Sequence, residues 1–207
     1  SKDLRQLAKP VNHGKNYLMG DETLVDSMGL KMVYKAAKLL YLPKKWAAKK
    51  IANYLGSLFV NAYPTVAIKY PKYIKFTVNQ FNKLTNAYGW TRYCFGNPNT
   101  NHADLRKYVA HLPQSTNAQA LNKATLLVFE NVWKKYGQAL FKMNAQIHDS
   151  LLTQYKEGHE YIIEEVKELQ EQAATIEIED ISGIKRTLRV PVDISMGGKS
   201  WQDSKDH

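Results

Sequence analysis

The sequence predicts a mixed α/β fold that is rich in helix, with a small antiparallel sheet toward its C-terminal end. Three observations favour this class. Apolar residues recur at helical spacing through much of the chain. Short apolar runs flank a polar turn near residue 149, which is typical of a hairpin. Proline and glycine divide the 207 residues into segments of ordinary element length.

Helices are predicted where apolar positions repeat every three or four residues between capping or breaking residues. Pro10 removes one hydrogen bond inside the first helix, so we expect a bend or break near Lys9. Pro43 is expected to open the third helix, and Gly137 to close the fifth. The predicted helices are residues 3–19, 24–40, 44–61, 66–87 with an interruption at Pro71, 104–136 as one helix or two joined near Pro113, and 158–174.

Strands are predicted where short apolar runs flank a turn. Residues 141–147 and 151–155 flank His148-Asp149-Ser150 and form one hairpin. Residues 175–180 and 185–194 flank Ser182-Gly183 and form a second pair. Residues 21–23 and 88–101 are predicted to be loops, since polar and turn-forming residues dominate them.

The chain is basic, with 29 Lys and Arg against 19 Asp and Glu and a formal charge of +10. Such an excess favours a polyanionic partner, nucleic acid above all. Lysines alternate with Tyr and Trp in residues 31–92, which suits contact with a phosphate backbone and stacking on bases. Residues 157–180 are rich in Glu and are predicted to form a solvated helix that faces away from nucleic acid.

Cys94 is the single cysteine, which excludes an internal disulfide framework and suits a reducing compartment such as the cytoplasm. No apolar run approaches the roughly 18 residues of a membrane span, so we expect no membrane partner. The histidines and Cys94 show no zinc-ligand spacing.

Arg5, Lys9, His13 and Tyr17 follow one another at intervals of four residues, which places them along one side of a helix. A guanidinium forms a planar fork for phosphate oxygens, and an ammonium acts as a point charge. Two cations one turn apart can span adjacent phosphates of a triphosphate while the two rings reach sugar and base. An ordinary basic surface helix would show the same spacing.

The segment Gln146-Ile147-His148-Asp149-Ser150 places a carboxylate at the turn of the predicted hairpin. An Asp held there projects hard oxygen donors, which suits a Mg²⁺ ion that also binds substrate phosphates. A His-Asp pair is also common at surface turns, so this segment alone is weak.

Together these motifs resemble the polymerase domain of family A DNA polymerases, the bacterial polymerase I and related phage type. Arg5-x3-Lys9-x7-Tyr17-x2-Gly20 resembles motif B of the fingers, and Gln146 to Asp149 resembles motif C of the palm. Further segments resemble the family in the same order: Tyr63-Pro64-x-Val66, Arg106-x7-Gln114 and Val190-Pro191-Val192-x4-Gly197-Gly198-x2-Trp201.

The resemblance implies a right-hand polymerase with fingers in residues 1–86 and the C-terminal palm in residues 87–207. It implies that Arg5 and Lys9 hold the triphosphate of the incoming dNTP. His13 would lie beside the deoxyribose, and Tyr17 would close on the templating base pair.

The same resemblance implies that Asp149 binds catalytic Mg²⁺ and that His148 lies near the primer 3′ end. With Lys9 and Tyr17, these two residues would form the catalytic set. Arg106 and Gln114 would contact the primer–template DNA.

The sequence departs from the family pattern at three motif positions: Ser150 replaces a Glu, His13 replaces Phe or Tyr, and Pro10 lies inside motif B. The family also carries a second metal-binding Asp in motif A, upstream of motif B, and Ser1 lies too close to motif B for this chain to contain it. Asp3 and Asp21 are poorly placed to substitute. We therefore expect a preceding segment or an N-terminal partner subunit to supply motif A.

Two alternatives stay open. A single-subunit RNA polymerase of the phage or mitochondrial kind shares the Arg-x3-Lys-x7-Tyr pattern and commonly reads His-Asp-Ser, as residues 148–150 do. The Arg106-x7-Gln114 segment and the 190–201 ending favour the DNA enzyme instead. A non-catalytic DNA-binding accessory subunit would use the basic charge without Asp149. A split or diverged enzyme would suit a virus acting in the host cytoplasm.

Overall fold

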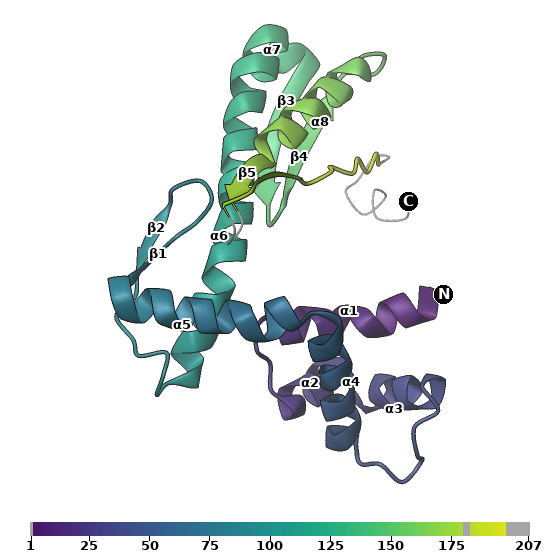
Figure 1. Cartoon of the computed structure of the whole chain (residues 1–207). Coiled ribbons are helices and arrows are strands. Elements are labelled where there is room, and N and C mark those ends of the chain that lie inside the picture. Colours follow the sequence, from purple (N-terminus) through teal and green to yellow (C-terminus); the bar gives the residue numbers. More distant parts are fainter. Residues whose placement is uncertain (1, 180–182, 198–207) are drawn as a thin grey trace. The chain divides into compact units, whose positions relative to one another are not determined.

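The computed structural model describes residues 2–179 and 183–197. The chain divides into two compact units (Figure 1). Unit 1 is Ser1–Leu84 with Thr91–Leu112, and unit 2 is Thr85–Trp90 with Pro113–His207. The long helix α6, His102–Val128, begins in unit 1 and ends in unit 2. The predicted helix-rich α/β class is confirmed.

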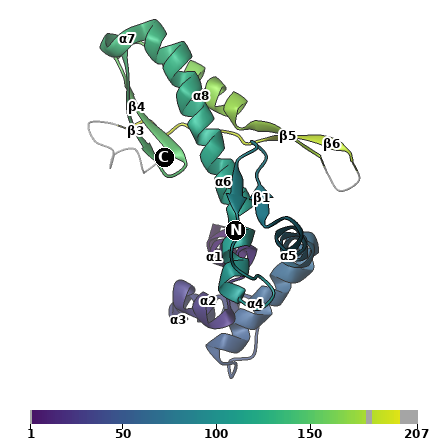
Figure 2. The same cartoon turned by 90° about the vertical axis from the view of Figure 1, so that its left-hand side faces the viewer.

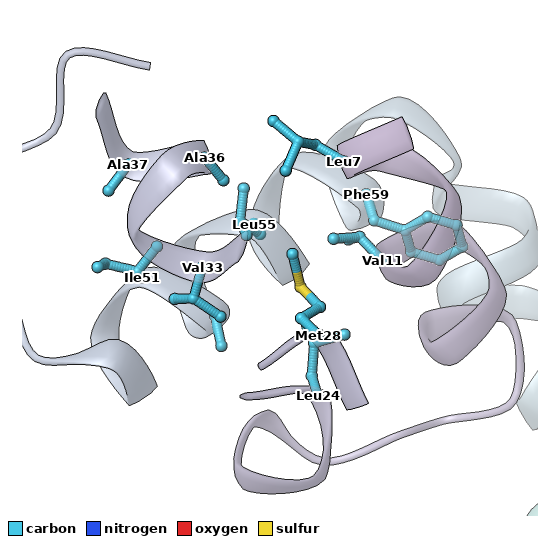
Figure 3. Close-up of a cluster of buried hydrophobic side chains, with 11 residues drawn as sticks. Leu7, Val11, Leu24, Met28, Val33, Ala36, Ala37, Ile51, Leu55 and Phe59 are labelled. Atoms are coloured by element: carbon cyan, nitrogen blue, oxygen red, sulfur yellow. The ribbon is translucent and has the colours of Figure 1, made fainter. Parts of the chain in front are cut away.

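Four helices form the first part of unit 1: α1 (Lys2–Asn16), α2 (Asp21–Met28), α3 (Leu30–Leu39) and α4 (Ala48–Ala62). Each contributes apolar side chains to one shared core, which Figure 3 shows in close-up. Leu24 and Val33 are fully buried there, and Ile51 is 1% exposed. The helical spacing of the apolar residues in the sequence therefore predicts correctly that these side chains are buried.

The boundaries of these helices differ from the prediction in several places, beginning with α1, which ends at Asn16 and not at residue 19. The helix predicted over residues 24–40 is split, because Gly29 adopts a φ of 73° that a continuous helix does not allow. Asp21 and Glu22, predicted to be loop, form the first turn of α2, where their charge complements the helix N-terminus. Residues 43–47 lie outside any helix, so α4 begins at Ala48 rather than beside Pro43.

The rest of unit 1 begins with a π-helical turn, η1 (Thr65–Lys69), that continues into α5 (Tyr70–Phe81). Pro71 lies at the start of α5, where its missing N–H is tolerated, so the predicted interruption is absent. A short two-stranded sheet follows, formed by β1 (Lys83–Thr85) and β2 (Thr91–Tyr93). A second core, built from α5, these strands and the start of α6, contains Ile74, Val78, Leu84, Cys94, Leu105, Tyr108 and Val109.

Unit 2 is built around the C-terminal part of α6. Its further elements are η2 (Phe129–Trp133), α7 (Lys134–Leu140), β3 (Phe141–Ile147), β4 (Ser150–Tyr155), α8 (Tyr161–Ala173), β5 (Thr175–Glu179) and β6 (Lys185–Arg189). Helix α6 runs through Pro113 without a break. Gly137 leaves helical geometry with a φ of 69°, as predicted. Figure 2 shows the β3–β4 hairpin and α8 beside α6. Their shared core holds Val128, Val132, Phe141, Ile162, Ile163 and Val166.

Both predicted strand pairs are present and antiparallel. In the first, Phe141 pairs with Tyr155 and Ile147 with Ser150, with an irregularity between Met143 and Ala145. Among the described residues the strands form three separate two-stranded sheets, so the single small sheet that we predicted for the palm is wrong. Asp180, the predicted end of one strand, lies outside the described residues.

Of the helices in the described part of the chain, none is both long enough and apolar enough to cross a bilayer.

Candidate nucleotide and metal sites

Helix α1 presents its cations to solvent because its opposite side is buried. Leu7 and Val11 are 7% and 6% exposed and pack in the first core, whereas Arg5 and Lys9 are exposed. Within the described residues neither cation forms an ion pair. The helix continues through Pro10, so the break predicted near Lys9 is absent. Both side chains are therefore free to bind an anion from one fixed helix.

Tyr17 lies beyond the end of α1 and not on the helical side that the four-residue spacing predicts. The helix ends because the Tyr17 and Met19 N–H groups both donate to the Gly14 carbonyl, at 3.1 and 2.9 Å, and Leu18 has a φ of 57°. The His13 and Tyr17 rings still meet edge to face, with centroids 5.3 Å apart. The two rings thus remain neighbours at the C-terminal end of the cationic helix.

A polar cluster that the sequence did not reveal fixes this end of α1. The Lys15 Nζ donates to Asp21 Oδ1 at 2.7 Å and to the Met19 carbonyl at 3.0 Å, and Asn53 Nδ2 donates to Asp21 Oδ2 at 2.9 Å. Burial raises the pKa of Asp21, but the hydrogen bonds from Lys15 and Asn53 outweigh it and leave the pKa below its ordinary value of 3.8. Asp21 therefore links α1, α2 and α4.

The turn of the β3–β4 hairpin consists of His148 and Asp149, both exposed. His148 has a φ of 54°, and two-residue hairpin turns of the primed types require a positive φ at this position. Ser150 belongs to β4, where its Oγ donates to the Ile147 carbonyl at 2.9 Å and closes the turn. Asp149 makes no hydrogen bond or ion pair with any other described residue, so its carboxylate projects freely.

Gln146 aligns this hairpin on α6. Its amide nitrogen donates to Asn122 at 3.3 Å, and its amide oxygen accepts from the Thr125 hydroxyl at 3.3 Å. Gln146, on β3, thus supports the hairpin through α6, while Asp149 lies in the turn beyond the strand.

Asp149 fits one carboxylate of a Mg²⁺ site but does not complete a two-metal site. Its oxygens are hard donors at an exposed turn, as Mg²⁺ prefers. Among the described residues no group of three His, Cys, Asp or Glu side chains could hold a metal ion. A clamp on two metals needs a further acid from elsewhere.

A hollow of about 1560 Å³ lies in unit 2, lined by the hairpin, α6, α8 and residues 190–197. Asp149 and Lys142 are among its lining residues. Glu171 of α8 holds the C-terminal segment by pairing with Arg189 and accepting the Val192 N–H at 3.3 Å. Residues of α8 predicted to be merely solvated thus have structural partners.

The same correction applies to Glu165 on α8. It accepts from Lys135 at 3.1 Å and from the Tyr136 hydroxyl at 2.8 Å. The charge run in the sequence did not indicate these contacts, because α7 and α8 are distant along the chain.

The remaining motif residues lie on α6 and at segment junctions. Arg106 and Gln114 are both exposed on α6, in unit 1 and unit 2 respectively. Tyr63 follows α4, and its ring contacts Phe59 with centroids 5.3 Å apart. Gly198 and Trp201 lie outside the described residues.

Solved structures similar to this chain include a polymerase domain. Neither the protein-family models nor the curated proteins contain a match to the chain. The POL domain of Pol1 from M. smegmatis, in complex with DNA primer-template and dNTP, matches with a TM-score of 0.63 and 17% sequence identity. The match covers 85% of this chain and 28% of that chain.

The fold is polymerase-like. At this identity the match establishes the fold alone, and the chain spans just over a quarter of the protein it matches. The cationic helix α1 belongs to unit 1 and the hairpin turn to unit 2. The assignment of fingers to residues 1–86 and palm to residues 87–207 stays a prediction, as do the roles of the individual site residues.

Proposed function

We propose that the chain is the C-terminal part of a template-directed DNA polymerase of the family A type, which binds an incoming dNTP, primer–template DNA and Mg²⁺. The observation that carries the proposal is a polymerase-like fold in which some motif residues are exposed and form no hydrogen bond or ion pair with any other described residue. Arg5 and Lys9 on α1 and Asp149 at the hairpin turn meet that condition.

In this proposal Arg5 and Lys9 bind the triphosphate. Four residues of helix separate their Cα atoms by about 6 Å along the axis, which suits neighbouring phosphates. Their positive charge would offset the charge that develops on the leaving pyrophosphate. His13 and Tyr17, in contact at the end of α1, would lie beside the sugar and the templating base pair.

The reaction is attack of the primer 3′-hydroxyl oxygen on the α-phosphorus of the dNTP. A phosphorus–oxygen bond forms there as the bond to the β-phosphate oxygen breaks, and pyrophosphate leaves. Asp149 would hold Mg²⁺, which when bound lowers the pKa of the 3′-hydroxyl and neutralises phosphate charge. His148 would position the primer end, and Arg106 and Gln114 would contact the duplex.

The proposal includes a second carboxylate from outside this sequence. The chain offers Asp149 at the turn, and Asp21 is occupied by Lys15 and Asn53. A preceding segment or partner subunit carrying motif A would complete the metal site.

Primer extension with Mg²⁺ tests the proposal, using this chain with and without the segment or subunit that carries motif A. We expect deoxynucleotide incorporation when both are present and none from the chain alone. A strong preference for ribonucleotides would replace the DNA enzyme with the RNA polymerase alternative. DNA binding without synthesis in the complete assembly would favour an accessory subunit.

A further inference from the structure

The positive charge of the chain is concentrated in residues 27–103, most of which belong to unit 1. No Asp or Glu occurs between Asp26 and Asp104, whereas this stretch contains eleven Lys and one Arg. Its charge of +12 exceeds the +10 of the whole chain, so the remainder carries −2, the difference between 10 and 12. A surface in this segment has few acidic neighbours along the chain to neutralise it.

Within this segment η1 and α5 form one continuous helical surface. Lys69, at their junction, has helical dihedrals of φ −71° and ψ −42°. On the inner side of α5, Ile74 and Val78 are buried, at 0% and 1% exposed, and the Tyr70 hydroxyl donates to the Val109 carbonyl at 2.9 Å. These contacts hold α5 rigidly against the second core.

The outer side of this helix carries two rings and two lysines, which we name the α5 surface: Lys69, Lys72, Tyr73 and Phe76. Their separations of three, four and seven residues place them on one side. Tyr73 is 55% exposed and Phe76 is 63% exposed. Large rings held this far open to water on a fixed helix lose the burial that normally stabilises them.

None of these four side chains forms an ion pair or a ring contact with another residue in the described part of the chain. Lys69 and Lys72 form no ion pair there. Tyr73 and Phe76 take part in no ring contact with another described residue. Both the charges and the ring faces are therefore available to a ligand.

We propose that the α5 surface binds single-stranded DNA, with Lys69 and Lys72 on the phosphates and Tyr73 and Phe76 stacked on bases. Three residues of helix separate the Cα atoms of Tyr73 and Phe76 by about 4.5 Å along the axis, so the two rings can reach neighbouring bases of one strand. A duplex hides its base faces in the stack, so it could use the lysines but not the rings. This surface lies wholly in unit 1, and its binding of DNA does not require the chain to catalyse synthesis.

Fluorescence anisotropy of the full chain with labelled oligothymidylate, without Mg²⁺ or nucleotide, tests this proposal. We expect the Tyr73→Ala and Phe76→Ala substitutions each to weaken binding at least about five-fold. The Lys69→Gln/Lys72→Gln double variant should lower the slope of log affinity against log salt by about 1.4. Circular dichroism checks that these exposed substitutions leave the fold intact.

Helix α3 supplies matched controls. Tyr34 is 46% exposed, and Lys31 and Lys38 on the same helix are exposed. Tyr34→Ala should leave affinity unchanged, and Lys31→Gln/Lys38→Gln removes the same charge as the α5 double variant. Losses equal to those of the α5 variants would show non-specific attraction and overturn the proposal.

Two further outcomes also count against single-stranded DNA. Equal sensitivity of duplex binding to Tyr73→Ala and Phe76→Ala would exclude base stacking on this surface. If sedimentation velocity shows that these substitutions abolish self-association while oligothymidylate affinity is unchanged, the α5 surface is instead an interface between copies of the chain.

Discussion

Helix α1 and the β3–β4 turn both present polar side chains on a rigid support. They differ in how many of the groups needed to bind a ligand each one supplies. On α1, Arg5 and Lys9 form no ion pair with any other described residue, the other side of the helix is buried, and His13 contacts the ring of Tyr17 just beyond the helix end. The turn offers the one carboxylate of Asp149, and no cluster of metal-binding side chains accompanies it in the described residues. In the proposed polymerase, this chain therefore supplies the two cations for the triphosphate and one carboxylate for the metal site.

The largest expected effect comes from Asp149, the carboxylate at the β3–β4 turn. Asp149→Asn keeps the size of the side chain but removes its charge, so it should lower primer extension by the complete assembly about 10³-fold. Single-stranded DNA binding by the chain should be unchanged. Asp26→Asn on the exposed side of α2 is the matched control. Synthesis at the wild-type rate by the Asp149 variant would remove this residue from the metal site.

The second prediction tests the cations of helix α1. Lys9→Ala removes one charge-assisted contact to phosphate and should weaken Mg²⁺–dNTP binding about ten-fold or more, measured by titration with a fluorescent dNTP. Arg5→Ala should act in the same direction. Lys38→Ala on α3 removes the same charge from an exposed position outside the site. If it weakens nucleotide binding equally, α1 contributes general charge and no specific contact.

The sequence predicted these two regions unequally well, for physical reasons. The hairpin was predicted to within one residue, because two short apolar runs around a polar turn leave few alternatives. On α1 the spacing correctly grouped Arg5, Lys9 and His13, but it placed Tyr17 on the helix. The left-handed conformation of Leu18, a residue that rarely adopts it, ends the helix first.

Long-range contacts were the least predictable part of both regions. Lys15 meets Asp21 across a turn and Asn53 lies on another helix, so neither pairing follows from spacing along one element. The same holds for Glu171, which looked like a solvated residue of a charged helix and instead holds Arg189. Local patterns specify elements, whereas these partners depend on how helices pack.

A smaller effect should come from Gly56, which lies against Lys15, the residue that joins the end of α1 to Asp21. A Cβ at this buried glycine would stand 2.7 Å from the Lys15 Cε, so Gly56→Ala must displace the lysine from Asp21. Alanine gains roughly 0.5–1 kcal/mol over glycine inside a helix, which offsets part of the lost Lys15–Asp21 contact. We therefore expect a net loss of unfolding free energy below about 1 kcal/mol. Chemical denaturation measures it.

Gly20→Ala is the control for this substitution. Gly20 has a φ of −68° and a ψ of 160°, which alanine adopts freely, and a Cβ there meets nothing within 4 Å. Because Gly20 is the N-cap of α2, where glycine is preferred to alanine, we expect a loss of only about a few tenths of a kcal/mol. Equal losses in both variants would mean that the Lys15 contact does not stabilise α1.

The smallest predicted effect concerns how the stability that Asp21 contributes through Lys15 and Asn53 depends on pH. The pKa of Asp21 is lowered in the folded state, so its ionised form stabilises the fold above the ordinary pKa of 3.8, and this contribution is lost as the pH falls through the folded-state value. Stability should therefore decline below about pH 4 in the wild type and decline less in Asp21→Asn. Thermal unfolding followed across this range gives the comparison, with the exposed Asp26→Asn as control.

Parallel curves for wild type and Asp21→Asn would show that Lys15 and Asn53 do not favour the charged carboxylate. The orientation of α1 would then depend on the apolar contacts of Leu7 and Val11 alone, and the cationic helix would keep its place under acid conditions in which the Lys15–Asp21 pair is lost.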